Sequence, residues 1–276
     1  MAGTAPSGSN VLLTRILSAA ILAPVAIVVA YVGGWPFALF WTAAALAILW
    51  EWMGLVAAAN RVALAAGVVA IVVSAPCAML GRPLAALSVI AIGAIAAALS
   101  ALPQQRGWAA GGVIYAGLML MAPLLLRGDG MIGAEALFLL FAIVWTTDVL
   151  GYFAGRAIGG PKLAPSVSPA KTWSGAAAGV VGAAIVVALG ARFVPQARLT
   201  TLIAVAVALS IMSQLGDLLE SAFKRRFGTK DTSQLIPGHG GVMDRLDGFW
   251  AAAVCAALFG VLRSGFAEPA AGLLLW

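Results

Sequence analysis

Nine long apolar stretches fill most of the chain and place the strongest limit on its fold. They cover about residues 12–32, 36–56, 62–80, 84–102, 110–126, 134–155, 173–190, 200–219 and 249–265. Stretches of roughly 17–25 apolar residues have the length at which an α-helix crosses a bilayer. They do not alternate polar and apolar residues, which argues against a membrane β-barrel. Because 63% of all residues are hydrophobic, the sequence predicts an all-α polytopic membrane protein with about nine transmembrane helices.

Polar residues divide the chain into three parts. Residues 1–10 are small and polar, and we expect them to be disordered. Residues 11–133 contain apolar stretches separated by short breaks, and we expect them to be N-terminal transmembrane helices that act as a scaffold. Residues 134–276 contain most of the residues that can do chemistry, and we expect them to be the catalytic transmembrane region. The first apolar stretch lacks a clear cleavage site, so it is expected to be a retained helix rather than a signal peptide.

Basic residues indicate the orientation in the membrane. If the N-terminus is cytoplasmic and nine helices alternate, eleven Lys and Arg lie on the cytoplasmic side and five on the other. The eleven are Arg15, Arg61, Arg106, Arg156, Lys162, Lys171, Lys224, Arg225, Arg226, Lys230 and Arg245, and the five are Arg82, Arg127, Arg192, Arg198 and Arg263. Cytoplasmic loops are enriched in such residues. This topology places both polar loops, residues 156–172 and 220–248, on the cytoplasmic face. The net charge of +6 is then explained by loops facing anionic lipid, and no nucleic-acid partner is expected.

Charged residues, rare elsewhere, gather in residues 220–247. This segment contains nine of the 26 charged side chains (16 Lys and Arg, 10 Asp and Glu) and the only histidine, His239. The nine are Glu220, Lys224, Arg225, Arg226, Lys230, Asp231, Asp244, Arg245 and Asp247. Charges kept at the ends of membrane helices are costly and usually functional. The sequence therefore predicts the functional site here.

Two acidic residues lie within apolar helices. Asp148 is about two turns inside the end of its predicted helix, where a charge needs a partner, a metal or a watery cavity. A structural hydrogen bond between helices is the alternative. Gly151 and Gly155 follow it with the spacing that lets another helix approach closely. Asp217 belongs to a polar stripe at helical spacing, formed by Ser210, Gln214, Asp217, Ser221 and Lys224. A solvated helix end would explain Arg225 and Arg226 but not Asp217, which follows a long apolar run.

A glycine-rich segment precedes the third acidic group. Gly240 and Gly241 can turn backbone N–H groups toward an anion. Asp244 and Asp247 are three residues apart at the start of the last predicted helix, so both carboxylates face one way. Carboxylates alone would repel a phosphate, which implies a bridging divalent cation, and hard oxygen ligands suit Mg²⁺. His239 has three possible roles, as a base, a phosphate contact or a structural loop residue, and we favour contact with a phosphate or nucleotide.

The other polar loop carries hydroxyls and lysines suited to phosphate, namely Ser168, Lys171 and Thr172. It lacks the spacing of a P-loop. Carboxylates for a metal beside cations for several phosphates are typical of phosphoryl or nucleotidyl transfer, in which catalysis is mostly positioning and charge neutralisation.

Residues 221–247 resemble, over 27 residues without a gap, the signature of the phosphatidate cytidylyltransferases. The matching pattern is Ser221-x-Phe-Lys-Arg-x4-Lys230-Asp231-x-Ser-x2-Ile-Pro-Gly-His239-Gly-Gly-Val-x-Asp244-Arg245-Leu-Asp247. The stretches Asp148-x-x-Gly-Tyr-x-x-Gly-Arg and Ser168-Pro-x-Lys171-Thr172-x-Ser-Gly also resemble that family. Many members have a second lysine where this chain has Ala170.

The resemblance implies a multi-pass enzyme of the inner membrane, active on its cytoplasmic face. It implies CTP, phosphatidic acid and Mg²⁺, with a second cation as an option, and products CDP-diacylglycerol and pyrophosphate. Membrane lipid is a partner, and a homodimer is left open. The expected catalytic residues are Asp148, Asp217, Lys224, Asp244 and Asp247, with Asp217 and Asp244 as metal ligands. The expected substrate-binding residues are Ser168, Lys171, Thr172, Ser221, Arg225, Lys230, Asp231, His239, Gly240, Gly241 and Arg245. A CTP-dependent lipid kinase and an ion-coupled transporter are the alternatives.

Overall fold

The computed structural model describes residues 8–56, 60–128, 130–236 and 240–276. Almost all regular structure in these residues is helical. The α-helices are α1 (Gly8–Val32), α2 (Gly34–Leu55), α3 (Arg61–Met79), α4 (Pro83–Ser100), α5 (Arg106–Arg127), α6 (Met131–Ile158), α7 (Trp173–Gly190), α8 (Leu199–Arg226), α9 (Met243–Ser264) and α10 (Pro269–Leu274). Two 3₁₀ turns, η1 (Pro103–Gln105) and η2 (Ala191–Phe193), and two strands, β1 (Lys162–Ala164) and β2 (Ser168–Thr172), complete the described elements.

The prediction of an all-α polytopic membrane protein is confirmed. Among the described residues, the eight helices α2–α9 are long and apolar enough to cross a membrane, and the described apolar part of α1 covers Ala20–Val32. Each of the nine apolar stretches lies in its own helix. Residues 8–10, expected to be disordered, begin α1, while residues 1–7 lie outside the described residues.

The helices extend further at one end of the molecule than the hydropathy suggested. α6 continues to Ile158 and α8 to Arg226, so the polar loops are shorter than residues 156–172 and 220–248. Basic residues occupy the last turns of both helices, where they interact favourably with the helix dipole. The first loop also forms a feature that the sequence did not predict, an antiparallel hairpin that pairs Lys162 with Thr172.

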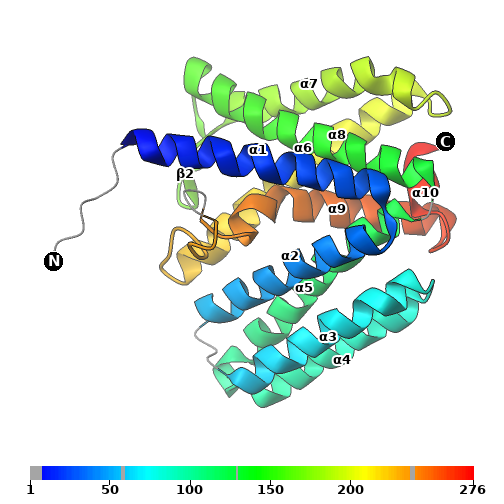
Figure 1. Cartoon of the computed structure of the whole chain (residues 1–276). Coiled ribbons are helices and arrows are strands. Elements are labelled where there is room, and N and C mark those ends of the chain that lie inside the picture. The colour runs from blue at the N-terminus through cyan, green and yellow to red at the C-terminus, as the bar shows by residue number, and fades with distance from the viewer. Residues whose placement is uncertain (1–7, 57–59, 129, 237–239) are drawn as a thin grey trace.

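The long helices run roughly parallel or antiparallel to one another, from side to side in the view of Figure 1. The β-hairpin and the loop between α8 and α9 lie at the same end as the start of α1, and α10 lies at the opposite end with the C-terminus. Both polar loops therefore share one end of the molecule, as the alternation of helices predicted.

Glycines allow the close helix contacts on which the site depends. A Cβ added to Gly175 on α7 would lie 2.6 Å from the carbonyl oxygen of Gly151 on α6, which confirms the predicted close approach at Gly151 and Gly155. A Cβ on Gly216 of α8 would lie 2.6 Å from the carbonyl oxygen of Asp247 on α9. Backbones at such distances leave no room for a side chain, so α8 and α9 are in close contact beside Asp247.

Aromatic side chains tie α2 to the two helices that carry the acidic cluster. Trp52 stacks on Phe223 of α8 with ring centroids 4.0 Å apart, and Trp41 stacks on Phe249 of α9 at 4.9 Å. Offset and stacked aromatic pairs contribute beyond their buried area. The second helix is therefore packed directly against the region that bears the chemistry.

Candidate active site

Lys224 is the central cation of the site. Its ammonium nitrogen lies 2.7 Å from Glu220 Oε2, one helical turn earlier on α8, and 2.6 Å from Asp244 Oδ1 on α9. The three side chains are largely withdrawn from solvent, with exposed fractions of 13%, 1% and 3% for Lys224, Glu220 and Asp244. This ion triad holds the end of α8 to the beginning of α9.

Asp244 is held by the loop that precedes it as well as by Lys224. Its second oxygen accepts the backbone N–H of Thr232 at 2.9 Å and that of Gly241 at 2.7 Å, together with the Thr232 hydroxyl at 2.9 Å. Gly240 has φ +84°, a conformation that side chains rarely adopt. A Cβ there would also approach Asp244 Oδ2 to 2.8 Å. The glycine-rich segment thus turns the N–H of Gly241 onto this carboxylate.

Lys171 brings the hairpin to the same cluster. Its ammonium lies 2.5 Å from Asp217 Oδ2, and the Ser221 hydroxyl donates to Asp217 Oδ1 at 3.3 Å. The neighbouring Thr172 is buried and caps α7, because its hydroxyl accepts the N–H of Gly175 at 3.2 Å. Ser168 pairs with Ala164 within the hairpin. An ion pair therefore joins the hairpin to α8.

The remaining predicted acids belong to the same electrostatic group. Asp148, exposed on α6, lies within electrostatic range of Asp247, Asp217 and Lys171. Asp247 on α9 interacts in turn with Asp217 and Glu220. The structure thus brings the five predicted catalytic residues into one cluster, with Glu220 as an additional acid.

The predicted substrate-binding cations lie around this cluster on the surface. Arg225, Lys230 and Arg245 are exposed, and so is Asp231. Arg225 donates to the carbonyl oxygen of Thr229 at 3.2 Å. Gly241 is buried beside Asp244, while His239 lies outside the described residues.

The carboxylates of the cluster are candidate ligands for a divalent cation. Within the described ranges no three Asp, Glu, His or Cys side chains converge as a ready metal site. Asp217 and Asp244 are each paired with a lysine instead. The cluster nevertheless holds more carboxylates than cations. Glu220 Oε1 is buried without a hydrogen bond among the described residues, while Oε2 meets the Lys224 ammonium. Hard oxygen donors with excess negative charge fit a hard divalent cation.

Glu51 was not predicted as part of the site. It is 2% exposed near the end of α2 and contacts the loop before α9. The available signal was its isolation, since it is the only Asp or Glu in the first 128 residues. A single acid within an apolar helix is a functional candidate by itself.

Comparison with known proteins shows the family of this chain. A model of the cytidylyltransferase family matches residues 13–262. The chain belongs to the cytidylyltransferase family. It is 42% identical over 267 residues to a phosphatidate cytidylyltransferase of Brucella abortus biovar 1 (strain 9-941), covering 93% of this chain and 94% of the relative. The corresponding Brucella melitensis protein is 43% identical with the same coverage, and that of Haemophilus influenzae is 46% identical over 125 residues, 44% of this chain and 43% of the relative.

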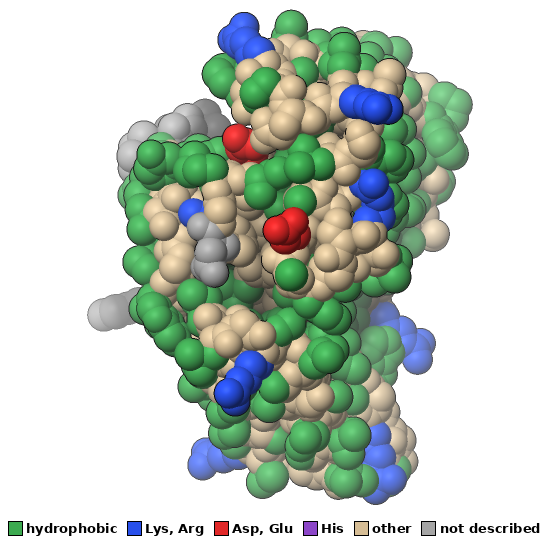
Figure 2. Space-filling model, turned by 90° about the vertical axis from the view of Figure 1, so that its right-hand side faces the viewer, with side chains coloured by type: hydrophobic (Ala, Val, Ile, Leu, Met, Phe, Trp, Pro, Cys, Tyr) green, Lys and Arg blue, Asp and Glu red, His purple; other side chains and the backbone are tan. Residues whose placement is uncertain are grey.

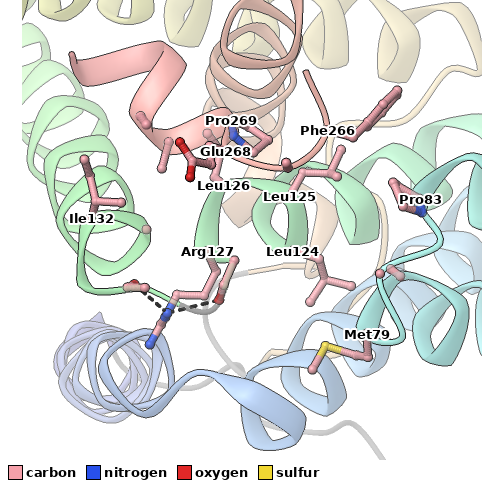
Figure 3. A pocket seen from close by; sticks show the side chains of 18 of the residues that line it. Met79, Pro83, Leu124, Leu125, Leu126, Arg127, Ile132, Phe266, Glu268 and Pro269 are labelled. Carbon is pink, nitrogen blue, oxygen red and sulfur yellow. Dashed lines mark hydrogen bonds between the residues drawn. The ribbon is translucent and has the colours of Figure 1, made fainter. Parts of the chain in front are cut away.

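The opposite end of this cytidylyltransferase-family chain has a different character. Figure 2 shows acidic side chains at only two places on that face, with basic side chains scattered over it. A cavity of about 910 Å³ opens there, lined mostly by apolar side chains such as Leu124, Ile132 and Phe266 (Figure 3). Arg127, at its edge, is buried and donates to the carbonyl oxygens of Ala30 at 2.6 Å and Tyr31 at 3.0 Å. This cavity is separate from the acidic cluster, and Arg127 joins the end of α5 to the end of α1.

Proposed function

We propose that this protein transfers the cytidylyl group of CTP to phosphatidic acid, giving CDP-diacylglycerol and pyrophosphate. The observation that carries the proposal is the ion cluster of Lys224, Asp244, Asp217 and Lys171 at one end of a bundle of membrane helices. Such a cluster suits a reaction between a lipid anion and a soluble polyanion. Relatives aligned over nearly the whole chain bear the name phosphatidate cytidylyltransferase.

The reaction needs little acid–base help from the protein. A phosphomonoester has a second pKa of about 6, so the phosphate of phosphatidic acid is largely ionised at neutral pH. One of its oxygens attacks the α-phosphorus of CTP, and the bond to the β-phosphate oxygen breaks to release pyrophosphate. The main obstacle is repulsion between two anions. Fixed cations that meet the developing charge lower this barrier.

The basic side chains have distinct tasks in this proposal. Lys171 and Lys224 lie within the cluster, and we propose that they meet the phosphates that react. Arg225, Lys230 and Arg245 are exposed around it and are proposed to hold the β- and γ-phosphates and the departing pyrophosphate. Ser221 is proposed to orient the nucleotide, and Gly240 and Gly241 to let its phosphates approach the loop backbone.

Mg²⁺ is the proposed cofactor, held by Asp217 and Asp244. Nucleotidyltransferases typically use a divalent cation, which supplies charge neutralisation between the two reacting anions. In the structure, each of these carboxylates forms an ion pair with a lysine, Asp217 with Lys171 and Asp244 with Lys224. We propose that Lys171 and Lys224 turn toward substrate phosphates in the loaded enzyme, leaving the two carboxylates for the cation. Glu220 and Asp247 then balance the charge of the cluster.

The membrane placement follows from the substrates. CTP is a cytoplasmic solute, so the end that holds both polar loops is proposed to face the cytoplasm, together with the N-terminus, in the inner membrane. Phosphatidic acid reaches the same end from the lipid. Residues 134–276 form the catalytic region in this proposal, supported by α2.

Product analysis with the purified protein tests the function. CTP, phosphatidic acid and Mg²⁺ should yield a CDP-lipid and pyrophosphate in equal amounts. Asp217→Asn and Asp244→Asn should each lower kcat at least 100-fold while the protein stays folded in detergent, because an amide lacks the charge. Glu135→Gln, at the opposite end of α6, is the matched control and should keep full activity. Release of CDP instead of pyrophosphate, or more than about a tenth of the rate in either asparagine variant at saturating Mg²⁺, would contradict the proposal.

A further inference from the structure

Glu51 makes an unusual set of contacts for an acid in a membrane helix. Its Oε1 accepts the Ser233 hydroxyl at 2.7 Å and the backbone N–H of Val242 at 2.8 Å. Its Oε2 accepts the N–H of Met243 at 2.8 Å and the Thr232 hydroxyl at 3.3 Å. Three of the four donors belong to the segment that connects α8 to α9, and the fourth, Met243, is the first residue of α9, all about 180 to 190 residues further along the chain. One carboxylate of α2 therefore joins the middle of that segment to the start of α9.

The N-terminus of α9 stabilises the carboxylate of Glu51. Among the residues that the structure describes, no Lys or Arg forms an ion pair with it. Its two backbone donors are N–H groups at the start of α9, where the helix dipole favours a negative charge. A buried carboxylate is stable only with such donors in place. The start of α9 therefore has its position fixed by an acid on another helix.

The contact continues to Asp244 through one residue. The Thr232 hydroxyl lies 2.9 Å from Asp244 Oδ2 and 3.3 Å from Glu51 Oε2, so its single hydrogen is shared between the two carboxylates. Gly241 lies between the same two side chains. A Cβ at Gly241 would approach Glu51 Oε1 to 2.5 Å, and its N–H donates to Asp244. Glu51 and Asp244 thus accept hydrogen bonds from opposite sides of the same loop.

We propose that Glu51 is a positioning residue for the transfer reaction. By holding residues 232–233 and the first turn of α9, it sets where Asp244 lies relative to the nucleotide phosphates and the proposed cation. It touches neither substrate nor cation. This role rests on the proposed function, because Asp244 is the group that Glu51 positions.

Glu51→Gln tests the proposal at constant side-chain length. The glutamine amide has one acceptor oxygen, and its NH₂ group would face other donors. The loop and the start of α9 therefore lose about half of the hydrogen bonds that they donate to Glu51. We expect kcat to fall about 10- to 100-fold, as a misplacement of about 1 Å does, while KM for phosphatidic acid stays within about twofold. Glu135→Gln, which removes a carboxylate that is bonded to Gln196 at 2.8 Å, should change neither constant.

A second readout needs no substrate. Trypsin cleavage after Lys230, which is exposed in the loop, reports local opening of that segment. Glu51→Gln should speed this cleavage at least fivefold and Glu135→Gln should not. If the wild-type protein made no CDP-lipid, the proposed function would fail, but cleavage after Lys230 would still test the contact.

Two results would overturn the positioning role. The first is unchanged kcat together with an unchanged cleavage rate in Glu51→Gln. The second is a loss of activity that disappears when the variant is assayed well below its thermal midpoint, since Glu51 would then serve only the stability of the fold.

Discussion

Replacing Lys224 by methionine should expose how much of the stability depends on one cation. The change removes the partner of two carboxylates, Glu220 and Asp244, whose exposed fractions are 1% and 3%. Breaking a buried ion pair by removing one partner costs about 3–5 kcal/mol. Asp244 keeps three other donors from Thr232 and Gly241, so most of the cost falls on Glu220. We therefore expect the lower value, about 3 kcal/mol, or a thermal midpoint about 6–12 °C lower at 2–4 °C per kcal/mol.

Tryptophan fluorescence during heating in detergent measures this shift, and a second substitution tests its cause. Adding Glu220→Gln to Lys224→Met removes the unpaired charge and should restore most of the midpoint, because the cost is that of an uncompensated carboxylate. The double variant should remain inactive, which separates stability from catalysis. Lys230→Met, at an exposed position, is the matched control and should leave the midpoint within about 1 °C. An unchanged midpoint in Lys224→Met, or no recovery in the double variant, would refute the account of the triad.

Two further predictions concern the surface and the membrane. In the pyrophosphate-release assay, Arg245→Ala should raise KM for CTP about fivefold or lower kcat. Arg192→Ala, at the opposite end of the molecule, is the control and should change KM and kcat by less than twofold. Equal effects of the two substitutions would mean that these charges serve only to set the membrane topology. Single cysteines at Ser166 and Gln234, both exposed, should be unreactive toward an impermeant thiol reagent added outside intact cells and reactive in inverted vesicles, in an otherwise cysteine-free background. Modification from outside at either position would place the loops on the wrong side of the membrane.

Hydropathy predicted the helices well because lipid leaves the backbone no alternative. Every apolar stretch of sufficient length must satisfy its N–H and C=O groups internally, and all nine stretches form helices. The ends were less predictable, since water tolerates both helix and loop. α8 therefore extends to Arg226 beyond its apolar part. The hairpin at Lys162–Ala164 and Ser168–Thr172 carries no alternating pattern that would have signalled strands.

The sequence predicted which residues form the acidic cluster but not how they pair. Lys171 and Asp217 are 46 positions apart, and their contact depends on the packing of the hairpin beside α8. Glu51 was visible as an isolated acid, but its partners lie about 180 residues away and follow from tertiary packing alone. Arg127 illustrates the opposite case, because a basic residue used to count loop charges is a buried structural donor.

The attachment of α2 to the loop before α9 has a consequence for recombination between relatives. Glu51 accepts bonds from that loop, and Trp52 stacks against Phe223 on the preceding helix. A chimaera with a crossover near residue 133 would take these two sides of one contact surface from different parents. Such hybrids should be unstable or inactive whenever the two parents differ in the packing or hydrogen bonding at this contact, even if each half folds and functions in its own parent. A crossover before Gly34 would keep both sides of the contact in one parent. The crossover sites that preserve the contact therefore lie far closer to the N-terminus than residue 133, the boundary that the distribution of charged residues suggests.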